Sequence, residues 1–217
     1  MKKILFPLPV LFALLFWVIF YLFPKPSPPP TTQPSNEPTS PPTEEQSSNP
    51  SPSISQPELL KPIVDFDTRI TKKSFGTYIT PQNSPVSPEK FSGYHTGVDV
   101  EYEDVAGDVP VVAITSGEVV TSKFATGYGG VVVIKHLIND KPLFAIYGHL
   151  RPDTLPEIDT EVSRGDTIGY LGTGYSPETD GERRHLHFGI SKTNSILGYV
   201  SRQSDLTNWL DPLSLYN

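Results

Sequence analysis

The pattern of hydrophobic and polar residues divides the chain into three stretches. Residues 4–23 form one apolar run without a charged side chain, and residues 24–57 contain almost no apolar residue. From residue 58 onward, short apolar runs alternate with polar segments. The pattern therefore predicts three units, at residues 1–23, 24–57 and 58–217.

The third unit has the pattern of a β protein. Its apolar runs are short, rich in β-branched and aromatic residues, and bounded by Gly, Pro, Asp or Ser, and no helical periodicity persists over three turns. Strands are expected at residues 110–114, 117–121, 130–136, 143–149, 167–171 and 185–190. Such closely spaced strands predict an all-β domain, an antiparallel β-sheet folded as a sandwich or open barrel. The tail from Asn208 to Leu213 is expected to pack an apolar strap against this sheet.

The first unit is long enough to cross a membrane. At about 1.5 Å per residue, a run of about 20 residues covers the roughly 30 Å hydrocarbon core of a bilayer. Lys2, Lys3 and the amino terminus outweigh Lys25, so the start of the chain is expected in the cytoplasm and the domain outside. A cleaved signal peptide is the alternative, but the run meets Pro24 without a small-residue cleavage pattern. We therefore expect a single-pass transmembrane anchor at residues 1–23, with the domain in the periplasm or cell-wall space.

The second unit, residues 24–57, consists mainly of Pro, Ser, Thr, Gln, Asn and Glu. Because it has little to bury, it cannot offset the entropy cost of ordering, and a disordered linker is expected. In polyproline II geometry it would reach on the order of 100 Å at most. The linker either holds the domain at the depth of a cell-wall layer or serves as a solubilising spacer.

Composition narrows the chemistry. The 217 residues include 17 basic and 24 acidic side chains, giving a net charge of −7, and the basic residues are scattered. A nucleic-acid partner is therefore not expected, because binding phosphate requires clustered basic residues. The chain has no cysteine, which excludes disulfides, thiolate zinc sites and a cysteine nucleophile. Any metal must be bound by nitrogen and oxygen.

The histidines supply such donors. In a strand, His185 and His187 share one face while Leu186 and Phe188 point to the other. His95 and Asp99, four residues apart, also share a face, and Gly97 and Val98 favour the extended form there. Catalytic zinc typically takes three protein ligands and leaves one position for water. Two histidines and one aspartate would fill that requirement, and two further histidines would remain for proton transfer.

In type and order, these motifs resemble the landmarks of lysostaphin-type (LytM-like) zinc endopeptidases of bacterial cell walls. The resemblance covers roughly residues 70–213. It rests on Ser74-Phe75-Gly76, His95-Thr96-Gly97-Val98-Asp99, Gly127-Tyr128-Gly129, Tyr147-Gly148-His149-Leu150, Gly165-Asp166-Thr167-Ile168-Gly169 and His185-Leu186-His187-Phe188. It implies a fold similar to the duplicated hybrid motif.

The resemblance also implies an activity and a site. The activity is hydrolysis of peptide bonds in peptidoglycan stems or cross-bridges. Carried over residue by residue, the Zn²⁺ ligands are His95, Asp99 and His187, and the catalytic residues are His149 and His185. Which of the two catalytic histidines accepts a proton and which donates one stays open.

The chain departs from the family pattern in several places. Residues 172–184 replace a short Gly/Ser/Thr segment ending in Gly-Pro, Gly189 stands where an acidic residue is common, and Thr77-Tyr78-Ile79 stands where an arginine is common. Substrate preference is therefore open. Tyr78 or Tyr94 could offer a hydroxyl to the oxyanion, but packing is the favoured role. For His136, which matches a histidine common at that strand end, a structural role is also favoured.

Two other functions stay in view. Some proteins of this fold have lost zinc ligands and activate separate wall hydrolases, but every ligand position is intact here, which favours an enzyme. A phosphocarrier or ligand-binding β domain needs no His-x-x-x-Asp and belongs in the cytoplasm, which the expected anchor contradicts. The expected partners are therefore peptidoglycan and the cytoplasmic membrane, and a regulatory protein that covers the groove stays open.

Overall fold

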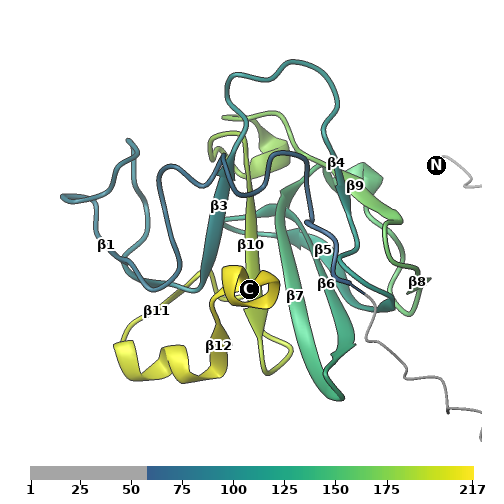
Figure 1. Cartoon of the computed structure of the whole chain (residues 1–217). Coiled ribbons are helices and arrows are strands. Elements are labelled where there is room, and N and C mark those ends of the chain that lie inside the picture. Colours follow the sequence, from purple (N-terminus) through teal and green to yellow (C-terminus); the bar gives the residue numbers. More distant parts are fainter. Residues whose placement is uncertain (1–57) are drawn as a thin grey trace, which may run out of the picture. The chain divides into compact units, whose positions relative to one another are not determined.

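The computed structural model of the chain describes residues 58–217 (Figure 1). The expected transmembrane anchor at residues 1–23 and linker at residues 24–57 lie outside the described residues. Within residues 58–217, no helix has the length and apolar character needed to span a bilayer.

The main sheet is built around three long strands that follow one another in the chain. These are β5 (Gly117–Ala125), β6 (Gly129–Ile138) and β7 (Lys141–Leu150), and each pairs antiparallel with the next. Strand β10 (His185–Ser191) continues the sheet beyond β7 and lies between it and β3 (Gly97–Glu101) (Figure 1). Short strands β8 (Glu161–Val162) and β12 (Trp209–Leu210) pair with β5 and β10.

Two smaller sheets and four short 3₁₀ helices complete the described domain. One sheet joins β1 (Tyr78–Ile79), β2 (Gly93–His95) and β11 (Tyr199–Val200), and the other joins β4 (Pro110–Val112) and β9 (Thr167–Tyr170). The 3₁₀ helices are η1 (Pro152–Thr154), η2 (Pro177–Thr179), η3 (Gln203–Asn208) and η4 (Pro212–Tyr216). Every pairing between these strands is antiparallel, which confirms the all-β antiparallel prediction for the described residues.

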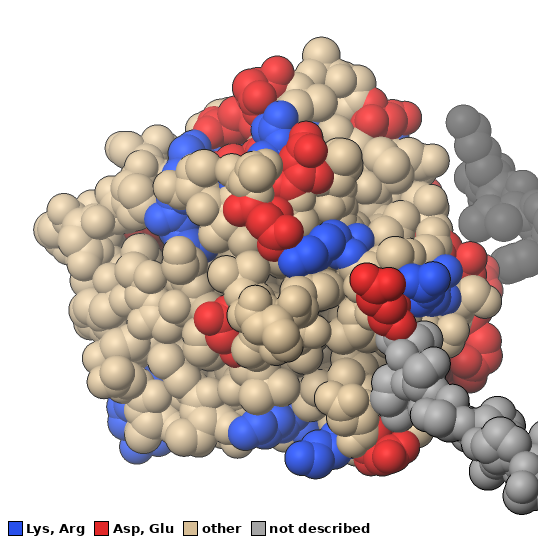
Figure 2. Space-filling model, viewed as in Figure 1, with Lys and Arg blue, Asp and Glu red and all other residues tan. Residues whose placement is uncertain are grey.

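The main sheet is covered on both faces, which explains the unbroken apolar run in β6. Alternate side chains of a strand point to opposite faces, so a strand with two buried faces has no polar positions to alternate with. One face contributes Val131, Val133, Ile146 and Trp209 to a cluster, and the other contributes Val132, Ile134, Tyr147 and Phe188 to a larger one. On the surface shown in Figure 2, acidic and basic side chains are interspersed.

The predicted strap at the carboxyl-terminal end is confirmed and is more regular than expected. Trp209 and Leu210 form β12, which pairs with Ser191 and Ile190 at the end of β10. Helix η4 then packs Leu213, Leu215 and Tyr216 against the larger apolar cluster. The strap therefore supports the strand that carries two of the candidate histidines.

Candidate metal centre

Strands β3 and β10 lie side by side in a register that pairs polar residues of the site. His187 lies opposite Asp99, and His185 lies opposite Glu101. Leu186 is fully buried in the apolar cluster on the other face. The predicted alternation of a polar and an apolar face along residues 185–190 is thereby confirmed.

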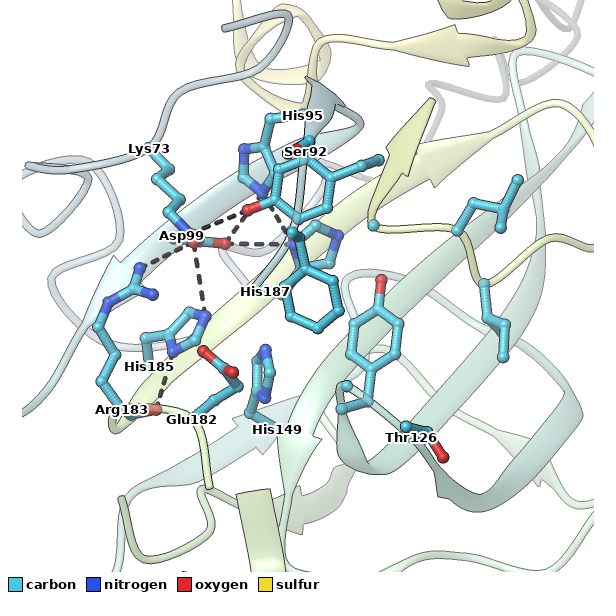
Figure 3. A pocket seen from close by; sticks show the side chains of 17 residues that line it. Lys73, Ser92, His95, Asp99, Thr126, His149, Glu182, Arg183, His185 and His187 are labelled. Atoms are coloured by element: carbon cyan, nitrogen blue, oxygen red, sulfur yellow. Dashed lines mark hydrogen bonds and ion pairs between the residues drawn. The ribbon is translucent and has the colours of Figure 1, made fainter. Parts of the chain in front are cut away.

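Three donor atoms converge at the centre of the site (Figure 3). His95 Nε2 lies 3.1 Å from His187 Nδ1 and 3.2 Å from Asp99 Oδ1, and His187 Nδ1 lies 3.1 Å from Asp99 Oδ1. Ligand atoms about 2.0–2.1 Å from a tetrahedral zinc ion lie about 3.3–3.4 Å from one another. The nearly equilateral triangle of two nitrogens and one oxygen therefore fits three ligands of such an ion.

The backbone around the triangle fixes the ring of His95. Its Nδ1 lies 3.2 Å from the carbonyl oxygen of Ser74, an acceptor, so Nδ1 carries the proton and Nε2 keeps its lone pair. Asp99 is 2% exposed. Burial raises its pKa, but the neighbouring His95, His185 and His187 hold the pKa of the Asp99 carboxyl well below its usual value. The triangle thus presents a lone pair on His95 and a carboxylate on Asp99, as a cation requires.

His185 and His149 lie beside this triangle, with ring centroids 4.1 Å apart. The Nδ1 of His185 donates to the carbonyl oxygen of Arg183 at 2.9 Å, so its Nε2 is the free acceptor when the ring is neutral. The Nδ1 of His149 is buried and has no hydrogen-bond partner among residues 58–217. Burial lowers the pKa of His149 to about 3 and that of His185 well below its usual value.

The motif Tyr147-Gly148-His149 places the His149 ring by two backbone features. His149 has a φ of 64°, a left-handed conformation that is rare for a residue with a side chain and that turns the ring toward His185. Gly148 leaves room for the ring of Tyr128, because a Cβ atom there would lie 2.3 Å from Tyr128 Cδ1. Tyr128 in turn lies 5.4 Å, between ring centroids, from both His149 and His187.

These side chains line a cavity of about 380 Å³. Its remaining wall is largely aromatic and aliphatic, with contributions from Phe91, Tyr128, Ile196, Leu197 and Tyr199. The Tyr128 hydroxyl is buried and has no partner among the described residues, whereas the Tyr199 hydroxyl accepts a hydrogen bond from Lys73 Nζ at 2.9 Å. The cavity therefore joins the candidate metal-binding triangle to a largely apolar wall.

The other candidates from the sequence lie elsewhere. His136 is buried and does not line the cavity. Its Nδ1 lies 3.0 Å from the Ser116 carbonyl oxygen, which supports a structural role. Tyr78 and Tyr94 pack on each other with ring centroids 4.8 Å apart, and neither lines the cavity. The cavity tyrosines are Tyr128 and Tyr199 instead.

Arg183 was not predicted as a site residue, yet it contacts the site directly. Its guanidinium pairs with Asp99 at 2.8 Å and with Glu101 at 2.7 Å. An arginine two residues before His185, opposite a strand with carboxylates at alternate positions, was the available signal. It becomes informative only when β3 and β10 are known to pair, because the contact spans more than 80 residues of sequence.

Residues 93–198 match Peptidase family M23. A structure of LytU is 30% identical, with a TM-score of 0.44, and the match covers 66% of this chain and 81% of that chain. A chain from the structure of the SpoIIQ–SpoIIIAH pore-forming complex is 22% identical, with a TM-score of 0.49, and the match covers 74% of this chain and 91% of that chain. A zinc-containing peptidase from Vibrio cholerae is 22% identical, with a TM-score of 0.36, and the match covers 55% of this chain and 37% of that chain. Comparison with curated proteins gave no match.

Proposed function

This chain belongs to Peptidase family M23 through residues 93–198, and from that membership we propose that it is a zinc-dependent endopeptidase that cleaves peptide bonds in peptidoglycan. The observation that carries the proposal is the triangle formed by His95 Nε2, His187 Nδ1 and Asp99 Oδ1, with sides of 3.1–3.2 Å. Membership suggests the reaction class, and the triangle supports a set of three ligands for the ion in this chain.

In this proposal, His95, Asp99 and His187 hold the ion. Zinc in such a set supplies Lewis acidity toward a peptide carbonyl and toward water. His149 and His185 carry out the proton transfers: one accepts a proton from the attacking water, and the other donates one to the leaving amine. Because burial lowers the pKa of both rings, both are neutral near pH 7. One ring therefore offers a lone pair to the water proton, and the proton that the leaving amine receives is this same proton, passed between rings whose centroids lie 4.1 Å apart.

The location of the activity belongs to the same proposal. A membrane anchor at residues 1–23 and a tether at residues 24–57 would hold the domain outside the cytoplasmic membrane, within reach of the cell wall. This is supported by the uncharged apolar run after Lys2 and Lys3 and by the proline-rich composition that follows it.

The test is mass spectrometry of fragments released from purified peptidoglycan by the full chain, with and without a zinc chelator. New peptide termini that disappear with the chelator are the expected result, and they also identify the bond that is cut. A His149→Ala variant should bind zinc and release no fragments. If the wild-type chain binds zinc but generates no new termini, the proposal of an enzyme is wrong, and a non-catalytic regulator of a separate wall hydrolase becomes the better explanation.

A further inference from the structure

The two oxygens of Asp99 have different partners. Oδ1 faces the nitrogens of His95 and His187 at 3.2 and 3.1 Å, as a third ligand atom should. Oδ2 accepts a hydrogen bond from Arg183 Nη2 at 2.8 Å and lies 3.5 Å from His185 Nε2. Figure 3 shows Asp99 between these two sets of partners. The carboxylate thus has one oxygen available to a cation and one already occupied.

The guanidinium that occupies Oδ2 is itself fixed. Arg183 Nε donates to Glu101 Oε2 at 2.9 Å, and Arg183 Nη2 donates to Glu101 Oε1 at 2.7 Å. Arg183 is 3% exposed and Glu101 is 8% exposed, so the pair is screened little by water. Asp99 and Glu101 alternate along β3 and therefore point to the same face, where one planar guanidinium reaches both.

Arg183 and the charged side chains around it, apart from Asp99, have a net charge of zero. Arg183 and Glu101 carry opposite charges, and Lys72 Nζ, 3.3 Å from Glu101 Oε2, is paired with Glu103 at 2.5 Å. The site therefore keeps the full negative charge of Asp99 for a cation, even though a guanidinium contacts it. A buried arginine that only added positive charge would weaken the binding of Zn²⁺.

From this arrangement we infer that Arg183, held by Glu101, is a positioning residue that restricts Asp99 to binding the metal through Oδ1 alone. The inference rests on the proposed zinc site and adds a residue from the segment before His185, where the chain departs from the family pattern. Groups that orient a metal ligand typically change metal affinity by about 10- to 100-fold when they are removed.

The sign of the effect separates positioning from charge. Removing Arg183 alone has two opposite effects on zinc affinity. The loss of a positive charge should raise the affinity, whereas the loss of a fixed orientation of Asp99 should lower it. The double variant Arg183→Met with Glu101→Gln removes one charge of each sign, so the net charge of the site is unchanged. Replacing both partners of a buried pair also avoids leaving one charge unpaired, and such replacements are often neutral for stability.

The experiment measures the zinc affinity of the full chain by competition with a chromophoric chelator, together with thermal unfolding of the zinc-free protein. For the double variant, we expect zinc affinity about 10- to 100-fold weaker than in the wild type, with zinc-free stability close to that of the wild type. Wild-type affinity in the double variant would overturn the inference. Weaker affinity accompanied by an equal loss of zinc-free stability would also overturn it, since that outcome indicates a purely structural role.

Two further variants complete the test. Arg183→Lys retains the charge but not the planar fork that bridges two carboxylates, so its zinc affinity should fall as well, whereas a charge effect alone predicts no change. Arg184→Met is the matched control, because Arg184 donates to the backbone carbonyls of Val105 and Gly107. Its zinc affinity should equal that of the wild type. A wild-type chain that binds no zinc would refute the proposed function and this inference together, whereas normal binding in both Arg183 variants refutes only the inference.

Discussion

A buried ion pair at the wall of the cavity gives a direct test of how this wall is packed. Lys73 Nζ lies 2.5 Å from Glu89 Oε2, and the two side chains are only 3% and 1% exposed. Glu89 also accepts hydrogen bonds from the backbone N–H of Phe91 at 3.0 Å and the hydroxyl of Ser84 at 2.8 Å. The pair therefore connects the segment that carries Phe91, a wall of the cavity, to the segment before β1.

Replacing Glu89 with Gln keeps the shape of the side chain and removes its charge. The ammonium of Lys73 would then be buried beside two neutral acceptors, the new amide oxygen and the Tyr199 hydroxyl, with no negative charge to pair with. Leaving one charge of a buried pair unpaired costs about 3–5 kcal/mol, whereas breaking an exposed pair costs about 0.2–1 kcal/mol. The structure therefore predicts a loss of about 3–5 kcal/mol in the free energy of unfolding.

The assay is urea unfolding of the zinc-free chain followed by circular dichroism, with the free energy obtained by linear extrapolation. Asp205→Asn is the control, because its partner Arg202 is 79% exposed and the loss there should stay below about 1 kcal/mol. The double variant Lys73→Met with Glu89→Gln should recover most of the stability. A Glu89→Gln loss no larger than that of the control would refute the assignment of this pair as buried.

The same pair predicts a dependence of stability on pH. Burial raises the pKa of Glu89, but hydrogen bonds from Lys73, Phe91 and Ser84 outweigh it and hold the pKa below its usual 4.5. A carboxylate with a lowered pKa in the folded state stabilises the protein above the unfolded-state pKa and loses that effect as pH falls. The difference in unfolding free energy between wild type and Glu89→Gln should therefore be largest near pH 7 and shrink as pH falls below about 4.5. A difference that stays constant down to pH 3 would contradict this reasoning.

Three further predictions concern the site itself. His95→Ala should abolish zinc binding measured by chelator competition, while His149→Ala should retain zinc and lose peptidoglycan cleavage; native turnover in His149→Ala would remove that residue from the mechanism. Gly148→Ala places a Cβ atom 2.3 Å from Tyr128 Cδ1 and should lower the free energy of unfolding by about 1–3 kcal/mol, with no loss if the ring moves freely. Zinc at 100 times its dissociation constant should stabilise the wild type by about 2.7 kcal/mol in thermal unfolding, and Asp99→Asn should lose most of that gain.

Much of the fold was predictable because local patterns decide it. Each of the six predicted strands overlaps an observed one, since β-branched runs bounded by turn residues specify extended structure within a few residues. The two-residue strands β1, β8 and β11 were not predicted, because they form where another segment offers hydrogen-bonding partners and not from their own composition.

The sequence by itself determined the chemistry available and the facing of the key side chains. Without cysteine, the donors had to be nitrogen and oxygen, and a period of two placed His185 and His187 on one face of a strand. These features depend only on residue identity and local backbone geometry. The order of the motifs then sufficed to suggest the family, which the match over residues 93–198 supports.

Only the tertiary structure decided which of these groups meet. His95 and His187 are 92 residues apart in sequence, yet their nitrogens lie 3.1 Å apart. They meet because β3, which begins two residues after His95, pairs with β10. The role of Arg183 and the choice of Tyr128 in place of Tyr78 likewise depend on strand register and packing. A local pattern fixes the direction in which a side chain points along its own strand, but its neighbours across the fold are set by the free energy of burying the whole core.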